Sequence, residues 1–407
     1  MPPRAREPPP LPLSGITGLR LVSEGRRRQT QMTLEEDQVS AEDRSLEIDN
    51  RQTRNPLLLI ALVAQWRDQE DGPVVFRVHK SILARSSSVF DDMFSLSAGE
   101  AMELYDGVPL VRMPDTGEDL ESFLQYLYCD PLLSLKPYDP DMPLKVRPLL
   151  RMADKFQVDA LREHIVAQLV SDWPQTVRQW DKLESEIKAR EDTLSSDYQY
   201  QQKWIFVDDQ FPEPASAIRL ARDFNMPEIL GPAFYHLSRI NIESNWDASR
   251  GVDQHGKPRR LCGRGYRTAR WELLEKEYYV SVLRGRHRLK AAAAKALNFM
   301  RVPSRSQAEK DQNPCTPKCD AEKLWFSWRD LNVRLAVTDD VLATLRVYAE
   351  ETLDTFDDHM CTFCYLKASA YICKCRKKLW EGLGEYFGLP AREGSASGDS
   401  SSEEEES

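Results

Sequence analysis

The segment VVFRVHKSILARSSSVFDDMF, residues 74–94, limits the fold of this chain more than any other part of the sequence. From Val74 to Val78, apolar residues occupy every second position, which is typical of a strand with one buried face. A turn signal, Asp71-Gly72, directly precedes this strand, and the apolar run LLLIALVA at residues 57–64 precedes the turn. The two apolar segments around the turn predict a β-hairpin.

The rest of the same segment has helical spacing. Its apolar residues recur at intervals of three, four and seven positions, and the main ones are Leu83, Phe90 and Phe94. The serines at 86–88 interrupt this pattern and supply an N-cap, because a serine hydroxyl accepts a hydrogen bond from a free N–H of the first helical turn. The segment therefore predicts a strand followed by two short helices.

More elements follow in the same region of the sequence. Residues 108–113 alternate again and predict a strand, and DTGEDLESFLQYLYCD predicts a helix with Leu120, Phe123 and Leu127 on its buried face. A proline-rich loop is expected over residues 131–148. Two more helices, with a break near Gln157, would then bury three further core residues, Ala153, Phe156 and Leu161.

His79, near the serines, also permits a catalytic interpretation. That interpretation requires His79 within about 2.6–3.2 Å of a serine hydroxyl and an acid that orients the imidazole. The segment has no nucleophile elbow and no glycine-rich oxyanion loop. We therefore favour a structural histidine at the end of a strand, with an enzyme of unknown type as the remote alternative.

Residues 57–170 resemble a BTB/POZ domain. The resemblance rests on FRVHKSILARSSSVFDDMF, DLESFLQYLYCDP and LLRMADKFQVDALREHIV, which occur in the order of the family's motifs. It implies an α/β BTB/POZ fold, with Val78 and His79 among its signature residues and a dimer interface near the first strand. At that strand this chain has Arg54-Asn55-Pro56 in place of the acidic residue usual in the family. The remaining chain contains AIRLARDFNMPEILGPAFYHLSRI, PCTPKC and, near its end, CTFC and KKLWEGLGEYFGLP. With these segments it resembles the C-terminal region of uncharacterised basidiomycete fungal BTB proteins.

The sequence divides into four predicted regions. Residues 1–54 are proline-rich and polar, and we expect them to be disordered. Residues 55–172 form the BTB/POZ domain, and residues 173–390 form a mainly α-helical C-terminal domain. Residues 391–407 form an acidic Ser/Glu tail that we also expect to be disordered.

Eight cysteines and no secretory leader indicate a reducing compartment, in which cysteines are thiols or metal ligands. Two pairs stand out, Cys315 with Cys319 and Cys361 with Cys364. Two such pairs can share one tetrahedral zinc ion, so two readings stay open: four ordinary thiols, or a structural zinc site. Further along, we expect Cys373 to be a core thiol and the lysine-flanked Cys375 to be exposed.

Charge is distributed unevenly along the chain. The formal net charge is −10, yet residues 250–301 contain fourteen Lys or Arg against four Asp or Glu. No helix-turn-helix or zinc-finger pattern frames this segment, so nucleic-acid binding is not favoured over a solvated helix face. The longest apolar run has eight residues, too few to span a membrane.

These observations predict a non-enzymatic interaction protein that works as a scaffold or adaptor. By resemblance, the BTB domain pairs with a second copy or with a cullin scaffold, and the helical domain selects another protein. The alternative is a nuclear, transcription-associated regulator that uses the basic segment 256–301, with Arg284, Arg286 and Arg288 as import residues. We expect an intracellular protein, cytoplasmic or nuclear, with no small-molecule substrate and no cofactor apart from the zinc ion of that reading.

Overall fold

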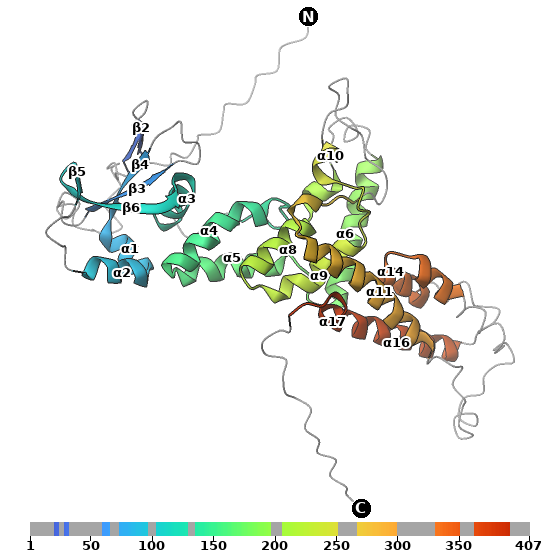
Figure 1. Cartoon of the computed structure of the whole chain (residues 1–407). Coiled ribbons are helices and arrows are strands. Elements are labelled where there is room, and N and C mark those ends of the chain that lie inside the picture. Colours follow the sequence, from blue (N-terminus) through green and yellow to red (C-terminus); the bar gives the residue numbers. More distant parts are fainter. Residues whose placement is uncertain are drawn as a thin grey trace, which may run out of the picture. The chain divides into compact units, whose positions relative to one another are not determined.

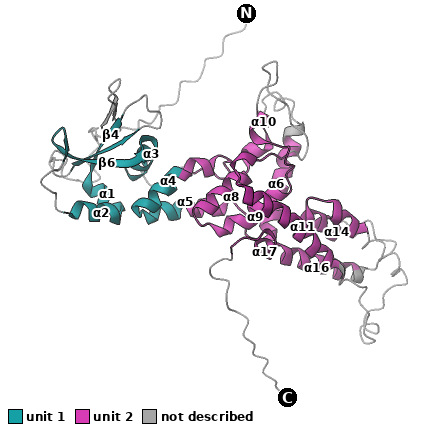
Figure 2. Ribbon diagram, viewed as in Figure 1, with its two compact units in different colours: residues 1–134, 148–164 teal, residues 135–147, 165–407 magenta. Residues whose placement is uncertain are grey.

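The computed structural model describes ten stretches of the 407-residue chain (Figure 1): residues 20–23, 28–31, 59–65, 73–96, 103–128, 135–196, 206–250, 267–298, 330–350 and 362–390. The chain divides into two compact units (Figure 2). Unit 1 comprises residues 1–134 and 148–164, and unit 2 comprises residues 135–147 and 165–407. No helix in the described stretches combines the length and the apolar character that a membrane span needs.

A mixed sheet forms the centre of unit 1, with strand order β1-β2-β4-β3-β6-β5. The predicted hairpin is confirmed: β3 (Leu59–Gln65) pairs antiparallel with β4 (Pro73–His79), and Ile60 lies opposite Val78. Strand β6 (Val108–Thr116) runs parallel to β3 on its other side. Both faces of β3 are largely buried, which explains why this strand is almost continuously apolar.

The two edges of the sheet are short strands. At one edge, β5 (Leu104–Tyr105) joins β6 through Asp106 and Gly107, both at positive φ, as a tight hairpin turn of this length requires. At the other edge, β1 (Arg20–Ser23) and β2 (Arg28–Gln31) pair with each other and with β4. These two strands are not predicted from the sequence, because backbone pairing needs no apolar periodicity.

Helices complete unit 1. Helices α1 (Lys80–Ser86), α2 (Ser88–Ser95) and α3 (Gly117–Tyr128) follow the strands as predicted. Helices α4 (Met142–Phe156) and α5 (Asp159–Ser171) break at Gln157, which adopts a left-handed φ of 50°. There the N–H of Val158 returns to the carbonyl of Ala153, a common way to end a helix.

The predicted loop over residues 131–148 is partly wrong, because α4 already begins at Met142. Pro143 lies in the first turn, where its missing N–H would have no partner within the helix. Pro148 lies further inside α4 and removes one helical hydrogen bond. The division between the units falls within α4 and α5, after residues 147 and 164, whereas the predicted domain boundary is residue 172.

Unit 2 is helical, as predicted. Its helices are α6 (Val177–Ser196), α8 (Pro214–Asp223), α9 (Pro227–Ser238), α10 (Trp246–Arg250), α11 (Lys276–Asn298), a helix over residues 330–337, α14 (Val341–Glu350), α16 (Thr362–Glu381) and α17 (Leu383–Phe387). Two single 3-10 turns, η3 (Val207–Gln210) and η4 (Trp271–Leu273), lie in the connections. Helices α8 and α9 are separated at Asn225, which has a φ of 53°.

Aromatic residues fill much of the core of unit 2. The ring of Trp180 on α6 lies 5.1 Å from Tyr235 of α9 and 5.5 Å from Trp380 of α16. Phe387 of α17 packs against Gly285 of α11, where even a β-carbon would come within 1.9 Å of its ring. Helices distant in sequence are thereby held in one unit.

Candidate functional site

The His79 region does not assemble a serine–histidine pair. The backbone N–H of His79 donates to the hydroxyl of Tyr128 at 2.6 Å, and its Nδ1 lies 3.3 Å from the same oxygen. Ser87 instead accepts from the N–H of Phe90 and donates to the carbonyl of Phe156. Burial lowers the pKa of His79 and raises that of Tyr128 to about 12, so both stay neutral near pH 7. These contacts are those of a strand end and a helix cap.

Most of the other residues expected in the unit 1 core are buried: Val78, Leu83, Phe90, Leu120, Phe123, Ala153, Phe156 and Leu161. Phe94 and Leu127 are only half-buried. The ring of Phe156 lies 4.5 Å from that of Phe90 and 5.6 Å from that of Phe123. The signature residues therefore pack the helices against one another and carry no visible chemistry.

The predicted zinc ligands lie largely outside the described residues. This holds for Cys315, Cys319 and Cys361, whereas Cys364 belongs to α16 by its backbone alone. Within the described part of the chain, no group of three or more His, Cys, Asp or Glu side chains could hold a metal ion. The zinc site stays a prediction.

The expectation for the last two cysteines is wrong. Cys373 is exposed and Cys375 is buried. The buried side of α16 runs through Ile372, Cys375 and Leu379, at intervals of three and four, and Cys373 lies off this side. The lysines near Cys375, at positions 374, 377 and 378, are exposed, but their exposure does not extend to the cysteine itself.

Several cations of the basic segment are used inside unit 2. Arg270 is 8% exposed, donates to the carbonyl of Pro140, pairs with Asp141 and lies 4.5 Å from the ring of Trp246. Arg286 on α11 donates to two backbone carbonyls at the carboxyl end of α9. These guanidiniums hold the fold together and are not available to phosphates.

A buried ion cluster joins three helices of unit 2. Arg239 pairs with Glu184 of α6 at 2.7 Å and with Asp340 before α14, and its guanidinium lies 4.6 Å from the ring of Trp180. Burial raises the pKa of Glu184, but the charge and the hydrogen bond of Arg239, together with the charge of Arg267, outweigh burial and hold that pKa below its usual value. Because every charged member has a partner, this cluster has the character of a structural contact.

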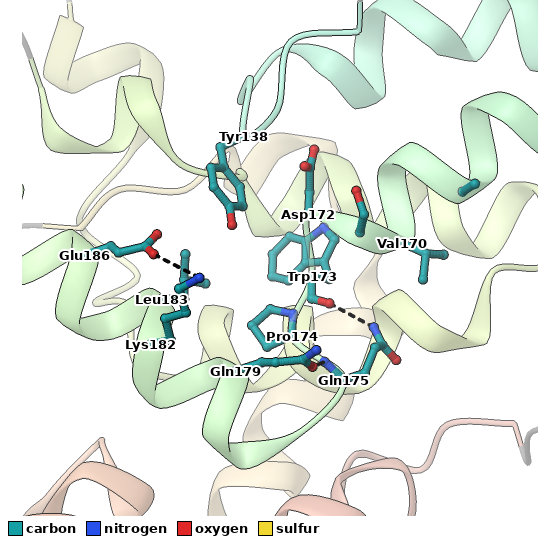
Figure 3. A pocket seen from close by; sticks show the side chains of 12 residues that line it. Tyr138, Val170, Asp172, Trp173, Pro174, Gln175, Gln179, Lys182, Leu183 and Glu186 are labelled. Carbon is teal, nitrogen blue, oxygen red and sulfur yellow. Dashed lines mark hydrogen bonds and ion pairs between the residues drawn. The ribbon is translucent and has the colours of Figure 1, made fainter.

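A pocket of about 370 Å³ lies in unit 2 where α5 ends and α6 begins (Figure 3). Its lining residues are Tyr138, Ala167, Val170, Ser171, Asp172, Trp173, Pro174, Gln175, Gln179, Lys182, Leu183 and Glu186. Figure 3 shows Tyr138, Asp172 and Trp173 grouped together, with Glu186 of α6 beside them. Residues from three parts of the chain thus meet around one cavity.

Asp172 is the unusual member of this pocket. It is 6% exposed, and it accepts hydrogen bonds from the backbone N–H of Tyr138 and, at 3.2 Å, from the side chain of Gln168. Burial raises its pKa to about 6, and these two donors only partly offset burial. The other buried aspartates of the described chain, Asp119 and Asp208, each lie within 4.0 Å of a guanidinium. In the described stretches Asp172 has no such cation.

Tyr138 forms one wall of the pocket. Its backbone is left-handed, with a φ of 59°, and its N–H points to Asp172. Burial, followed by the charges of Glu186 and Asp172, raises the pKa of Tyr138, so the phenol stays protonated near pH 7. Its ring lies 6.2 Å from that of Phe211. The wall is therefore an aromatic ring between two carboxylates.

Sequence reasoning did not identify this pocket. The available signal was Asp172-Trp173-Pro174, where a proline stops one helix two residues after an aspartate. Tyr138 lies beside this break although 33 residues separate it from Asp172 in the sequence. Such a tertiary contact leaves no periodic pattern from which it could be predicted.

Comparison with known families places the amino-terminal domain. Residues 70–172 match the family model described as BTB/POZ domain. No curated protein matches the chain, and no solved structure does. The predicted fold class is confirmed: a BTB domain with a small mixed sheet and helices, followed by a mostly helical region.

Proposed function

We propose that this chain is a non-enzymatic adaptor whose BTB domain associates with a second copy or with a cullin scaffold. The helical region of unit 2 would bind the protein that is brought to that assembly. The observation that carries the proposal is the BTB/POZ match over residues 70–172, since this domain is a protein-interaction module. The contacts of His79 and Ser87 support the non-enzymatic part, because both side chains are engaged in local structure.

Affinity purification of the full chain, with two differently tagged copies in one cell, tests the proposal. Recovery of the second tag shows self-association, and recovery of a cullin shows the scaffold version. Leu96→Asp and Leu104→Asp alter the most exposed large apolar side chains among the described residues of unit 1, which are 75% and 61% exposed. Leu366→Asp in unit 2 is the matched control at 58% exposure. If neither a second copy, a cullin nor another stable partner is recovered, the adaptor proposal fails.

The nuclear regulator is the second candidate, and the exposed side of α11 favours it. Arg284 and Arg288 are exposed there, whereas Arg286 is bound to carbonyls of α9. A double change of Arg284 and Arg288 to glutamine should abolish nuclear accumulation of the tagged chain if these residues form an import signal. Arg286→Gln should instead lower stability without a specific effect on localisation.

Two finer inferences from sequence complete the proposal. A structural zinc ion would join the Cys315 and Cys361 pairs, and metal analysis of the purified chain should then find about one equivalent. A value below about 0.2 equivalents would remove the zinc site. The resemblance to basidiomycete fungal BTB proteins and the intracellular location stay predictions from sequence.

A further inference from the structure

The charges around the pocket in unit 2 do not balance. Asp139, which raises the pKa of Asp172 by its charge, pairs with Lys145 at 2.7 Å. Glu186 has Lys182 at 3.8 Å. Asp172 has neither a lysine, an arginine nor a histidine partner in the described stretches. Among the described residues around the pocket, the carboxylates therefore outnumber the cations by one.

Asp172 also keeps unused hydrogen-bonding capacity. An ionised carboxylate has about four acceptor sites, and the N–H of Tyr138 and the amide of Gln168 occupy two of them. The contact with the N–H of Tyr138 gives Asp172 a structural role, because it ties the left-handed residue Tyr138 to the end of α5. About two sites remain on a side chain that lines an open cavity.

The other walls fit a cation as well. Tyr138 and Trp173 supply aromatic rings, and a cation near an aromatic face is stabilised further. Two donors of the pocket are engaged internally: the Gln175 side chain donates to the carbonyl of Trp173 at 2.9 Å, and the Ser171 hydroxyl donates to the carbonyl of Gln168 at 2.7 Å. At about 370 Å³ the cavity is at the small end for a ligand pocket, which suits one side chain rather than a nucleotide or a lipid.

We propose that this pocket receives a lysine or arginine side chain of a partner protein, with Asp172 as its counter-ion and Tyr138 and Glu186 as flanking walls. The inference rests on the proposed function, since it names the chemistry by which unit 2 recognises its partner. An ammonium or guanidinium group would supply the missing charge and fill the free acceptor sites of Asp172.

A titration of the full chain with small probes tests the pocket directly. The probes are N-acetyl-arginine amide, N-acetyl-lysine amide and the uncharged analogue N-acetyl-citrulline amide. Nuclear magnetic resonance of protein labelled at its nine tryptophans follows the indole signals, of which that of Trp173 reports on the pocket. At pH 7.5 at least one cationic probe should shift the Trp173 signal in a saturable way, and citrulline should bind at least about tenfold more weakly.

Four variants show which groups are responsible. Asp172→Asn should weaken the cationic probe at least about tenfold, and Glu186→Gln should weaken it a few-fold. Lys182→Gln removes a competing cation from an exposed position and should tighten binding about threefold, an effect that unfolding cannot produce. Asp247→Asn, an exposed carboxylate on α10, is the control and should change nothing.

Acidity adds an independent readout. The groups around Asp172 are Asp139 with Lys145, Glu186 with Lys182, Tyr138 and Gln168. Because the pKa of Asp172 is about 6, only about one-tenth of it is ionised at pH 5, and binding should weaken about tenfold from pH 7.5 to pH 5. Asp172→Asn should remove most of this dependence.

The outcomes distinguish failure of the cation-site proposal from failure of the adaptor proposal. If no cationic probe binds, if citrulline binds as well as arginine, or if Lys182→Gln weakens binding, the cation site is overturned. Purification of Asp172→Asn from cells then decides the wider question. Unchanged partners would leave the adaptor standing without this pocket, whereas selective loss of one partner that carries an exposed basic segment supports both.

Discussion

Replacing Ser87 with alanine tests the packing that organises unit 1. Ser87 is 2% exposed, and its single hydroxyl makes two contacts. It accepts from the N–H of Phe90 at 3.1 Å, which caps α2, and it donates to the carbonyl of Phe156 at the end of α4. One small side chain thereby connects elements 69 residues apart.

The expected loss of stability follows from these two contacts. Removing an N-cap serine costs about 1 kcal/mol. Leaving the buried carbonyl of Phe156 without this donor costs about 1–3 kcal/mol. Alanine has no hydroxyl to bury, and this offsets part of the lost free energy. We therefore expect the free energy of unfolding to fall by about 2–3 kcal/mol. Ser88→Ala is the matched control, because its exposed hydroxyl donates only to the side chain of Gln157, and its loss should stay below about 0.5 kcal/mol.

The assay must report on unit 1 alone. Tryptophan fluorescence mixes signals from both units, since Trp66 belongs to unit 1 and the described tryptophans all lie in unit 2. Hydrogen exchange by mass spectrometry at increasing urea, on the full chain, follows peptides from α2 and from the end of α4 separately. Both regions should lose protection together in Ser87→Ala. Two results would contradict this expectation: equal loss of protection in Ser87→Ala and Ser88→Ala, or loss of protection in α2 alone. Either result would show that the hydrogen bond from Ser87 to Phe156 does not stabilise the packing of α2 against α4.

Three further substitutions test unit 2 by urea unfolding of the full chain, monitored by tryptophan fluorescence. Gly285→Ala should cost about 1–3 kcal/mol, because its β-carbon would clash with the ring of Phe387, whereas Gly384→Ala, with open space around it, should cost under about 0.5 kcal/mol. Arg239→Met should cost about 3–5 kcal/mol, because it leaves two carboxylates without their cation; a loss under 1 kcal/mol would contradict this reading. Asp172 has a folded-state pKa of about 6, above its usual value of 3.8, so the folded chain binds the proton more tightly than the unfolded chain does. Its contribution to stability should therefore rise as pH falls from 8 to 5, and Asp172→Asn should be more stable than the wild type at pH 8 but not at pH 5; an equal difference at both pH values would refute this.

Much of unit 1 could be predicted because its pattern is local. The alternation from Val74 to Val78 and the run at residues 57–64 were enough to predict the hairpin of β3 and β4. The parallel pairing of β3 with β6 was not predicted, since a parallel register is fixed by a crossover and leaves no adjacent turn signal. Ser87 illustrates the same limit: its capping role is visible in the sequence, but its contact with Phe156 exists only after the chain has folded.

The cysteines of α16 show how a helical pattern is misread. The sequence around Cys373 and Cys375 allows two apolar stripes that differ by about half a turn, and the neighbouring lysines favoured the wrong one. Arg376 decides the matter: it is 6% exposed and pairs with Asp181 of α6 at 2.6 Å. The buried face of α16 therefore includes a charged residue, so apolar residues alone do not identify this face. Cys375, the neighbour of Arg376, lies on it.

Charge is the property for which the structure changes the functional argument most. The basic segment looks like a surface for an acidic partner when its cations are counted, but Arg270 and Arg286 are already bound to carbonyls and a carboxylate within unit 2. Exposed cations are the ones that remain accessible to a ligand, and on α11 these are Arg284 and Arg288, of which Arg288 also donates to the carbonyl of Glu385 at 3.3 Å. When the carboxylates are compared in the same way, by whether a cation lies nearby, Asp172 stands out. The net charge of −10 does not distinguish it from other carboxylates. A binding site should therefore be sought where a buried charged group has no partner of opposite charge. Burial has already removed water from that group, and an ion pair with a partner protein would offset the free energy that this desolvation costs.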